Sequence, residues 1–446
     1  MMDADKQKEL KQLSQYLEAK GFQEVRYYIK RKKRQYLNVR NQQIYSRDFG
    51  DETEYLAEGQ KAGRRGYTYF NQPFNHAVIA DRMNDCAKSS IIPWQERQYC
   101  QNGDLCDEPW EDPAEIKAVL EAAEKKAFAI KETAVVSECS YETVRETIYL
   151  LDHQENLLSD QTSYSCGRLR IVSKANGHIE TGDCCIYGEK IRDLNIVEAA
   201  AKTAAMAAEG LGGIPVLSGE YPILLENRVA AEILEAFLPV FYAENLYDGM
   251  SVLSGKEGTS IGTAALQLME QPLLPGGRCR RKVDDEGIPV QEKSLITDGI
   301  FTAKLYNSAA AVKESRKSSG NGFKSSAAAD VETGVTNIVI RGGEDMTKSQ
   351  EQLIKQMGEG LLVTGVDGVF AGVNHQTGDF SLIAKGLQIK PGKKTKPFRE
   401  VTIAGNFIKL LQDIEGLGEE WAMTLPARQC VAAPDILMKK LTVSGL

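Results

Sequence analysis

The chain has few of the residues from which metal centres are usually built. Its 446 residues include nine cysteines, scattered from Cys86 to Cys430 without a Cys-x-x-Cys pair, and only four histidines (His76, His153, His178 and His375). No two histidines have the spacing of zinc ligands on a helix, and a catalytic zinc takes three protein ligands. Cys184 and Cys185 would point to opposite faces of a strand. We therefore expect buried thiols and no metal site in this chain.

Long hydrophobic runs are also missing. The longest ones, such as 223–225 and 361–363, fall far short of the ~20 residues that a membrane-spanning helix needs. The first segment, "MMDADKQKELKQLSQYLEAKG", is charged throughout and is typical of an amphipathic helix rather than a signal peptide. These patterns predict a cytoplasmic protein that does not bind membranes.

Nothing in the sequence favours binding of nucleotides or nucleic acids. It contains neither Gly-x-Gly-x-x-Gly nor a P-loop, and its net charge of -8 repels phosphate backbones. The strongest basic run, "KRKKR" (30–34), is predicted to be a solvated hairpin tip between two strands. We expect no direct contact with nucleic acid.

The first 212 residues show one pattern twice. Helices are predicted at 5–20 and 76–88, and again at 113–129 and 194–209, and each pair encloses a meander of short alternating strands. This predicts an N-terminal α+β domain (1–212) with two repeated units, 1–90 and 113–212. The segment between the units, 89–113, is rich in proline, tryptophan and acid, which favours a long loop that acts as a lid or contacts a partner.

The second half, 213–446, begins after a glycine-rich break at 210–215. A strand at 221–226 precedes a helix that we expect Asn227 to cap. Hairpin signals then alternate with a helix at 348–358 and with a second helix capped by Asn406. The predicted fold class is α+β, with two domains and a largely antiparallel β domain with helices at the C-terminus.

The pattern "GTSIG" (258–262) matches the nucleophile elbow, in which a serine sits on a sharp turn between a strand and a helix. His375 follows it in the order that such hydrolases require. The preceding residues, "SVLSGKE", are polar and do not form a buried strand. A serine hydrolase using Ser260 and His375 is therefore an alternative hypothesis, and a non-enzymatic binding module is another.

The stretch "VNHQTGDFSLIAKG" (373–386) carries the residue types of a nucleophilic triad. Alternation along a strand would place Asp379 and Ser381 side by side, whereas triads are assembled from separate elements. We therefore assign no catalytic residue. Instead we predict a turn at Gly378 and a strand with Phe380 in the core, so that His375, Gly378, Asp379 and Ser381 line a substrate groove in which an extended peptide adds as a strand. The alternative is a polar face that is bonded to its own neighbours.

Several motifs in the second half resemble the TldD/PmbA family, whose PmbA members are also called TldE. They are "LLPGGRCRRKVDDEGIPVQEKSLITDGIFTAKLYNSAAA" (273–311), "GEGLLVTGVDG" (358–368), "NHQTGDFSLIAKGLQI" (374–389), "VTIAGNF" (401–407) and "CVAAPDILMKKLTVSG" (430–445). They occur in the family's order. The family was once described as modulators of DNA gyrase and is grouped with the metallopeptidases.

In that family, TldD-type subunits carry a His-Glu-x-x-x-His zinc motif on the first helix of the second half. The motif falls here on 235–240, "EAFLPV", where both histidines are absent and Pro239 lies within the window. The segment is typical of an amphipathic helix with Val229, Ile233, Phe237 and Val240 inward. The resemblance therefore implies the PmbA type, with Cys430 as a core residue.

The resemblance implies a cytoplasmic two-domain subunit that forms a homodimer, a heterodimer with a TldD-type subunit, or both. With that partner it would form a peptidase acting on small peptides, and the partner would supply the zinc. This chain would hold no cofactor, and whether it has catalytic activity of its own is left open. A link to gyrase would be indirect, through a peptide that acts on gyrase.

Overall fold

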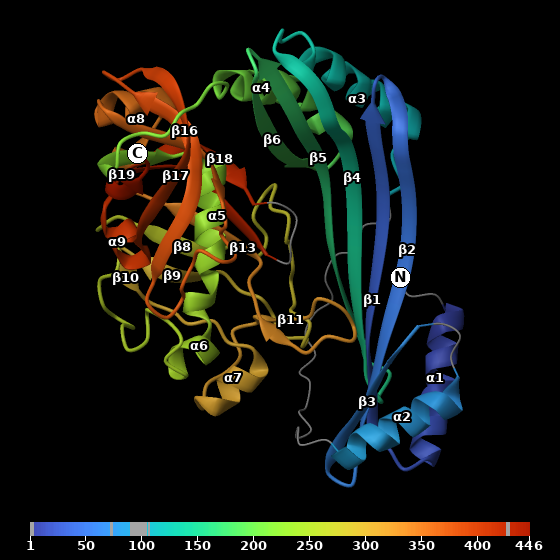
Figure 1. The fold of residues 1–446 in the computed structure, drawn as a ribbon. Helices are drawn as coiled ribbons and strands as arrows, with labels where there is room; N and C mark the ends of the chain where they lie inside the picture. The colour runs from blue at the N-terminus through green and yellow to red at the C-terminus, as the bar shows by residue number, and fades with distance from the viewer. Residues whose placement is uncertain (1–3, 72–74, 90–104, 106–107, 425–428) are drawn as a thin grey trace.

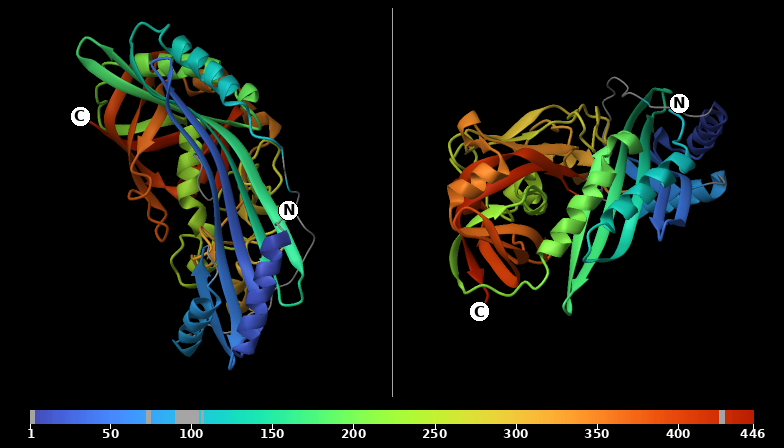
Figure 2. Two further views of the ribbon diagram at one scale, coloured as in Figure 1. Left: turned by 90° about the vertical axis from the view of Figure 1, so that its right-hand side faces the viewer. Right: turned by 90° about the horizontal axis from the view of Figure 1, so that it is seen from above.

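The computed structural model describes residues 4–71, 75–89, 105, 108–424 and 429–446 (Figure 1). Most of the segment predicted to be a lid or partner contact, 89–113, lies outside the described residues. Two further views show the first half as a long curved sheet standing against the second half (Figure 2). Among the described residues, no helix has both the length and the apolar composition needed to cross a lipid bilayer.

The first half contains the order helix, three strands, helix twice. The first set is α1 (Ala4–Ala19), β1 (Gln23–Arg40), β2 (Gln43–Lys61), β3 (Arg64–Phe70) and α2 (His76–Ser89). The second set is α3 (Pro113–Ala127), β4 (Thr133–Leu151), β5 (Leu157–Ala175), β6 (His178–Gly188), the 3₁₀ turn η1 (Ile191–Asp193) and α4 (Ile196–Glu209).

These strands form one antiparallel sheet in the order β3-β2-β1-β4-β5-β6, which is symmetric about the β1–β4 pair. Helices α1 and α2 lie at one end of the sheet, and α3 and α4 lie at the other (Figure 1). Each pair buries an apolar face, for example Leu10 and Leu13 of α1 and Ile116 and Leu120 of α3. The sheet therefore has a separate small core at each end.

The prediction that the basic run 30–34 forms a hairpin tip is wrong. The run lies in the middle of β1, because acids on the neighbouring strands face it. Lys30 pairs with Glu146 at 2.8 Å, and Arg31 pairs with Asp51 at 2.7 Å. Opposite charges on adjacent strands stabilise a sheet, so a basic run need not end a strand.

The turn between β1 and β2 is formed instead by Asn41 and Gln42, whose φ angles are 53° and 57°. Such angles suit a two-residue hairpin turn. The carboxylate of Glu124, on α3, accepts both backbone N–H groups of the turn at 2.7 Å. A contact from outside the hairpin thus helps to fix its position.

The second half begins with β7 (Gly219–Leu225), α5 (Asn227–Phe237), the 3₁₀ turn η2 (Leu238–Phe241) and α6 (Ala243–Tyr247). Its middle contains β8 (Gln267–Glu270), β9 (Lys293–Thr297), β10 (Ile300–Phe301), α7 (Ser308–Lys313), β11 (Gly322–Phe323), β12 (Glu332–Thr333), β13 (Asn337–Arg341), η3 (Glu344–Met346) and β14 (Thr347–Lys348). Its last part contains α8 (Gln350–Met357), β15 (Gly360–Asp367), β16 (Asp379–Ile389), β17 (Lys394–Asn406), α9 (Phe407–Gln412), β18 (Ile414–Met423) and β19 (Cys430–Ser444).

The main sheet of this half is mostly antiparallel and runs β10-β9-β8-β13-β19-β17-β16-β15-β7. Because β7 also pairs with β19, the strands β19, β17, β16, β15 and β7 close into a ring. Three pairs are parallel: β13 with β19, β14 with β18, and β15 with β7. The predicted α+β class, with a largely antiparallel second half, is confirmed.

Helix α5 packs against β19, β18 and β15 and belongs to the main core of this half. Val229, Ile233 and Phe237 are buried on it as predicted, and Val240 is buried in the turn that follows. The predicted N-cap is wrong, because Glu226 occupies the cap position and Asn227 is the first helical residue. The N–H of Asn227 donates to Asp435 of β19 at 2.7 Å, so a distant strand satisfies the helix start. Asn406 caps α9 as predicted.

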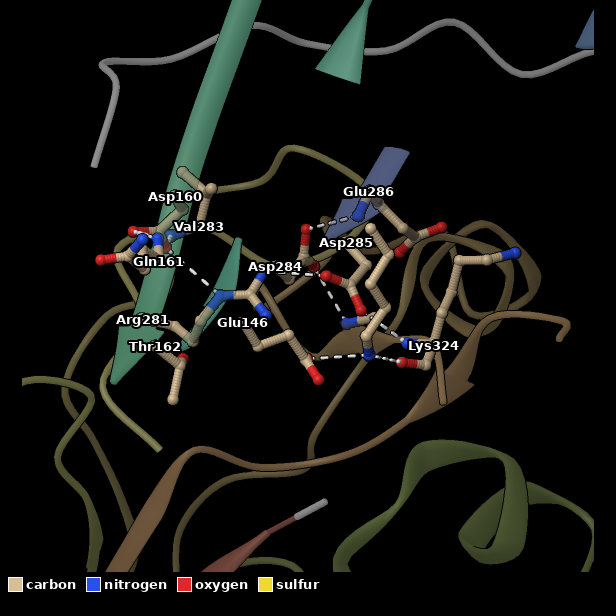
Figure 3. A network of polar contacts seen from close by, with 12 residues as sticks. Glu146, Asp160, Gln161, Thr162, Arg281, Val283, Asp284, Asp285, Glu286 and Lys324 are labelled. Atoms are coloured by element: carbon tan, nitrogen blue, oxygen red, sulfur yellow. Dashed lines mark hydrogen bonds and ion pairs between the residues drawn. The ribbon is translucent and has the colours of Figure 1, made fainter. Parts of the chain in front are cut away.

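The two halves meet at a buried polar network (Figure 3). Asp160 of β5 accepts the backbone N–H groups of Lys282 and Val283 at 2.7 and 3.1 Å, and the Nε of Arg281 at 3.3 Å. Arg281 also donates to Asp285 at 2.8 Å. The carboxylates of Asp160 and Asp285 therefore both accept hydrogen bonds within the network.

Candidate functional site

The predicted groove residues lie at the start of β16. Gly378 has a φ of +80°, and a Cβ at this position would lie 2.9 Å from the Cγ2 of Val252, so both the turn and the packing require glycine. Phe380 is buried in the core, which confirms its predicted orientation, while Asp379 and Ser381 are exposed on the opposite face.

The prediction that an extended peptide adds as a strand at this place is wrong, because both edges of the stretch are occupied. On one side, Asp379 to Ala384 pair with β17. On the other side, the preceding chain folds back, and the N–H of Ser381 donates to the carbonyl of Gly372 at 2.8 Å. A peptide would find no unpaired backbone there.

The side chain of Asp379 is bonded within the protein. Its Oδ1 accepts a hydrogen bond from Nδ2 of Asn406 at 2.9 Å, and this bond, followed by one from Thr377, lowers the pKa of Asp379. The arrangement matches the alternative interpretation of a polar face bonded to its neighbours. Asp379 and Ser381 lie on an exposed surface, and their contact with a substrate stays a prediction.

His375 and Ser260 are each engaged elsewhere. Nε2 of His375 lies 2.8 Å from the carbonyl oxygen of Ala236 at the end of α5, and its ring packs edge-on against Phe237. Ser260 is exposed and contacts the carbonyl of Gly262 at 3.5 Å, and β8 rather than a helix follows it. The strand–turn–helix of a nucleophile elbow is absent from this part of the described chain.

The segment onto which the resemblance places the zinc motif, 235–240, spans the end of α5 and the 3₁₀ turn that follows it. Residues 235–240 contain Glu235 but no histidine or cysteine, and Pro239 lies in the 3₁₀ turn that ends α5. Burial raises the pKa of Glu235 to about 7, although Arg278 opposes the shift. Across the described residues, no three His, Cys, Asp or Glu side chains converge as metal ligands would. This donor set does not fit a catalytic zinc.

The cysteines of the described chain are free thiols. Cys430 is fully buried in β19, as predicted for a core residue. Cys185 lies with its Sγ 3.0 Å from the Sγ of Cys166 on the neighbouring strand, and Thr203 of α4 is a hydrogen-bond partner of Cys184. The adjacent thiols thus have different surroundings and do not form a joint metal site.

A cavity of about 400 Å³ lies between the two halves of the molecule. Its first wall comes from β4, β5, β6 and the end of α4, and its second wall comes from α5, β15, β16 and β17. Six consecutive residues of β6, 180–185, face it. Because β6 is the last strand of its sheet, the cavity lies along a sheet edge.

Basic side chains of the second half close this edge. Lys385 pairs with Glu180 at 2.6 Å and donates to the carbonyl of Thr181 at 2.9 Å. Arg228 donates through Nη1 to the carbonyl of Asp183 and through Nη2 to the carbonyl of Thr364 at 3.4 Å. Cations on an exposed strand edge block the pairing of a further strand, so a ligand must enter by its side chains or termini.

Two glutamates of the second wall are poorly partnered. Glu232 lies 3.9 Å from the Nε of Arg228, which is too long for a hydrogen bond. The side-chain carboxylate of Glu226 has no hydrogen bond or ion pair with any described residue, and burial raises its pKa to about 7 against the opposing charge of Arg228. Burial also raises the pKa of Glu232. Perturbed carboxyls in a cavity are typical of functional sites.

Comparison with known proteins identifies the fold around this cavity. The sequence model of the PmbA/TldA metallopeptidase C-terminal domain matches residues 218–445, which is half of the chain. The chain belongs to this metallopeptidase family. All of the second wall of the cavity lies within the matched region, whereas β5, β6 and α4 precede it.

Curated relatives agree with this assignment. Metalloprotease PmbA of Escherichia coli O157:H7 is 27% identical over 276 residues, which cover 62% of this chain and 57% of that protein. The match thus spans less than three fifths of the length of that relative. A metalloprotease PmbA homolog of Buchnera aphidicola subsp. Acyrthosiphon pisum is 26% identical over 345 residues, covering 76% of this chain and 72% of that protein.

Two solved structures share the fold over nearly the whole chain. A putative modulator of a DNA gyrase from Thermotoga maritima superposes with a TM-score of 0.83 at 24% identity, covering 97% of this chain and 98% of that one. TldE from Thermococcus kodakarensis gives a TM-score of 0.83 at 20% identity, covering 98% and 100%. At these identities the likeness establishes the architecture.

Sequence reasoning missed the cavity because its walls come from eight separate elements. One local signal was available. Helix α5 is apolar over most of its length, yet Arg228 and Glu232 follow each other at helical spacing, directly after Glu226. Charged residues grouped on one side of a buried helix point to a polar cavity or an interface.

Proposed function

We propose that this chain is a metal-free, PmbA/TldE-like subunit of a cytoplasmic TldD/TldE-type metallopeptidase complex that acts on small peptides. The observation that carries the proposal is the state of α5. At the family's zinc position the helix packs into the core with Phe237 and offers no histidine. A TldD-type subunit would then supply the zinc and the general base.

In such a complex this chain would contribute binding rather than metal chemistry. The cavity between β6 and α5 is our candidate for that role, since it holds about 400 Å³ and its lining includes the poorly partnered carboxyls of Glu226 and Glu232. Ligand sites commonly lie between domains and hold a few converging polar groups. The chain would assemble as a heterodimer with the TldD-type subunit, as a homodimer, or as both.

Turnover of peptides tests this proposal. The chain alone should not cleave casein-derived peptides, whereas the chain mixed with a TldD-type subunit from the same organism should cleave them faster than that subunit alone. If this chain leaves the cleavage rate of the TldD-type subunit unchanged, the result would favour the hypothesis of a non-enzymatic binding module. Cleavage by the chain alone that disappears in Ser260→Ala would favour the serine hydrolase and contradict the proposal.

Association can be tested separately by sedimentation velocity. The proposal expects a dimer of this chain, a complex with the TldD-type subunit, or both, at micromolar concentration. A chain that stays monomeric in the presence of that subunit would contradict the proposed assembly. Most stable interfaces of this kind bury more than ~1,000 Å² in total, so a stable dimer should survive dilution to this range.

A further inference from the structure

The polar groups that line the cavity between β6 and α5 differ in how many ion pairs and hydrogen bonds they already make within the protein. On the first wall, Asp183 pairs with Arg170 at 2.6 Å and Glu180 pairs with Lys385 at 2.6 Å. These charges are compensated within the protein. A ligand that bound to them would first have to break an existing ion pair.

The guanidinium of Arg228 is also largely occupied. Both of its terminal nitrogens donate to main-chain carbonyls, and its Nε faces Glu232 at 3.9 Å. It is therefore fixed against β6 and β15 rather than free to bind an incoming anion. Its positive charge is the nearest compensation for Glu226 and Glu232.

That compensation is incomplete. The cations that act on Glu226 are Arg228 and Lys394, whereas Glu232 and Asp435 repel its charge. Asp435 already accepts hydrogen bonds from Asn227 and Gln350. Of these three carboxyls, those of Glu226 and Glu232 receive no hydrogen bond from a described residue. A poorly partnered carboxylate that is partly shielded from water is costly. Glu226 and Glu232 are half-buried, and a cation bound at these carboxylates would reduce this cost.

The cation that fits is organic rather than a metal ion. Hard metal ions take six or more oxygen ligands in a compact shell, and no three acidic, histidine or cysteine side chains converge in the described chain. An ammonium or a guanidinium, in contrast, needs only one or two carboxylates and can reach them on a flexible stem.

We propose that this cavity binds a positively charged group of a peptide, an ammonium or a guanidinium, through the carboxylates of Glu226 and Glu232. This inference rests on the proposed function and names the class of peptide that the subunit would select. The charged group comes either from a lysine or arginine side chain or from the free N-terminus of the peptide. The cations that close the edge of β6 prevent the peptide from binding there as an added strand.

Calorimetric titration of the isolated chain at pH 8 and low salt tests the inference independently of turnover. The probes are an acetylated, amidated alanine pentapeptide with a central lysine, the same peptide with norleucine, and the norleucine peptide with a free N-terminus. We expect at least tenfold tighter binding of one or both charged peptides than of the neutral one. Binding of the lysine peptide would identify a side chain as the source of the charge, and binding of the peptide with a free N-terminus would identify the terminus.

The site is tested with Glu226→Gln/Glu232→Gln, which keeps the shape of both side chains. The charged peptide should bind at least tenfold more weakly to this variant, and binding should be unchanged in Glu415→Gln, which alters an exposed glutamate of β18. Equal affinity for charged and neutral peptides, binding of neither charged probe, or full affinity in the double variant would each overturn the inference. The turnover experiment decides the proposed function separately.

A pH series on the unaltered chain covers the case in which the double variant fails to fold. Glu226 faces Arg228 and Glu232 of α5, Lys394 of β17 and Asp435 of β19. Because burial raises its pKa to about 7, the carboxylate takes up a proton as the pH falls from 8 to 6. Affinity for the lysine peptide, whose ammonium stays protonated from pH 8 to 6, should fall over this range, and a constant affinity of that peptide would contradict the inference.

Discussion

The two halves of the molecule meet at two clusters of charged side chains, and the clusters differ in how their carboxylates are partnered. In the network of Figure 3, the carboxylate of Asp160 accepts four hydrogen bonds and that of Asp285 accepts two. In the cavity, the carboxylate of Glu226 accepts none from the described residues. Both clusters lie between the two halves and carry acidic side chains. Neither property therefore distinguishes a structural cluster from a ligand-binding site.

The state of the hydrogen bonds does distinguish them. Asp160, Arg281 and Asp285 are 2%, 8% and 3% exposed, and each meets a partner. Buried polar groups that are fully partnered hold a structure in one arrangement. Carboxyls that lack partners in a cavity lower stability and leave binding capacity. The first cluster therefore joins the halves, and the second is available to a ligand.

The largest effect is expected at the first cluster. Asp160→Ala should lower the free energy of unfolding by about 3–5 kcal/mol, because it leaves the buried Arg281 and three backbone N–H groups short of acceptors. Urea denaturation measures this loss. Asp81→Ala, at an exposed position of α2, is the control and should change stability by less than ~0.5 kcal/mol. Equal losses in the two variants would contradict the structural role of the network.

The second cluster should respond in the opposite direction. Glu226 has a pKa of about 7 in the folded chain against 4.5 ordinarily, so the folded state favours the protonated form. The stability that this provides is present below pH 4.5 and is lost as the pH rises through 7. Glu226→Gln, which mimics the neutral form, should therefore raise the free energy of unfolding by ~1–3 kcal/mol at pH 8.

The gain should disappear at pH 4.5, where the native glutamate is itself protonated in the folded state. Denaturation curves at both pH values measure the difference, and the exposed Glu415→Gln serves as the matched control. A gain of the same size at both pH values would mean that packing rather than charge is responsible. A loss at pH 8 would show that Glu226 is partnered after all.

The smallest effect on stability is expected at the exposed face of β16. Asp379→Ala/Ser381→Ala removes the bond from Asn406 but no buried contact, so the unfolding free energy should change by less than ~1 kcal/mol. We predict that peptide turnover by the assembled complex falls nevertheless. Unchanged turnover in a folded variant would show that these residues belong to the scaffold.

Local patterns in the sequence predicted much of the fold. Alternation along 379–384 placed Phe380 in the core, and the apolar positions of α5 were identified correctly. The errors arose where a distant residue decides the local structure. Glu146 and Asp51 extend β1 through its basic run, and Asp435 replaces the side-chain cap expected from Asn227.

The cavity shows the same limit more strongly. Residues of β6 and α5 that face each other across it are about 45 positions apart in the chain, as the bond from Arg228 to Asp183 shows. No periodicity in either segment encodes the distance between them. The family motifs, in contrast, could be recognised from sequence because they are contiguous, and the match to residues 218–445 confirms the family.

The zinc content of the purified chain tests the central claim most directly. The account predicts less than about 0.1 equivalent of zinc by elemental analysis after dialysis, and no saturable zinc binding at micromolar concentration, because 235–240 lacks histidine and cysteine. One equivalent of zinc that survives dialysis and depends on Glu235 would contradict it. The chain would then hold a metal centre of its own and would not depend on a partner for its chemistry.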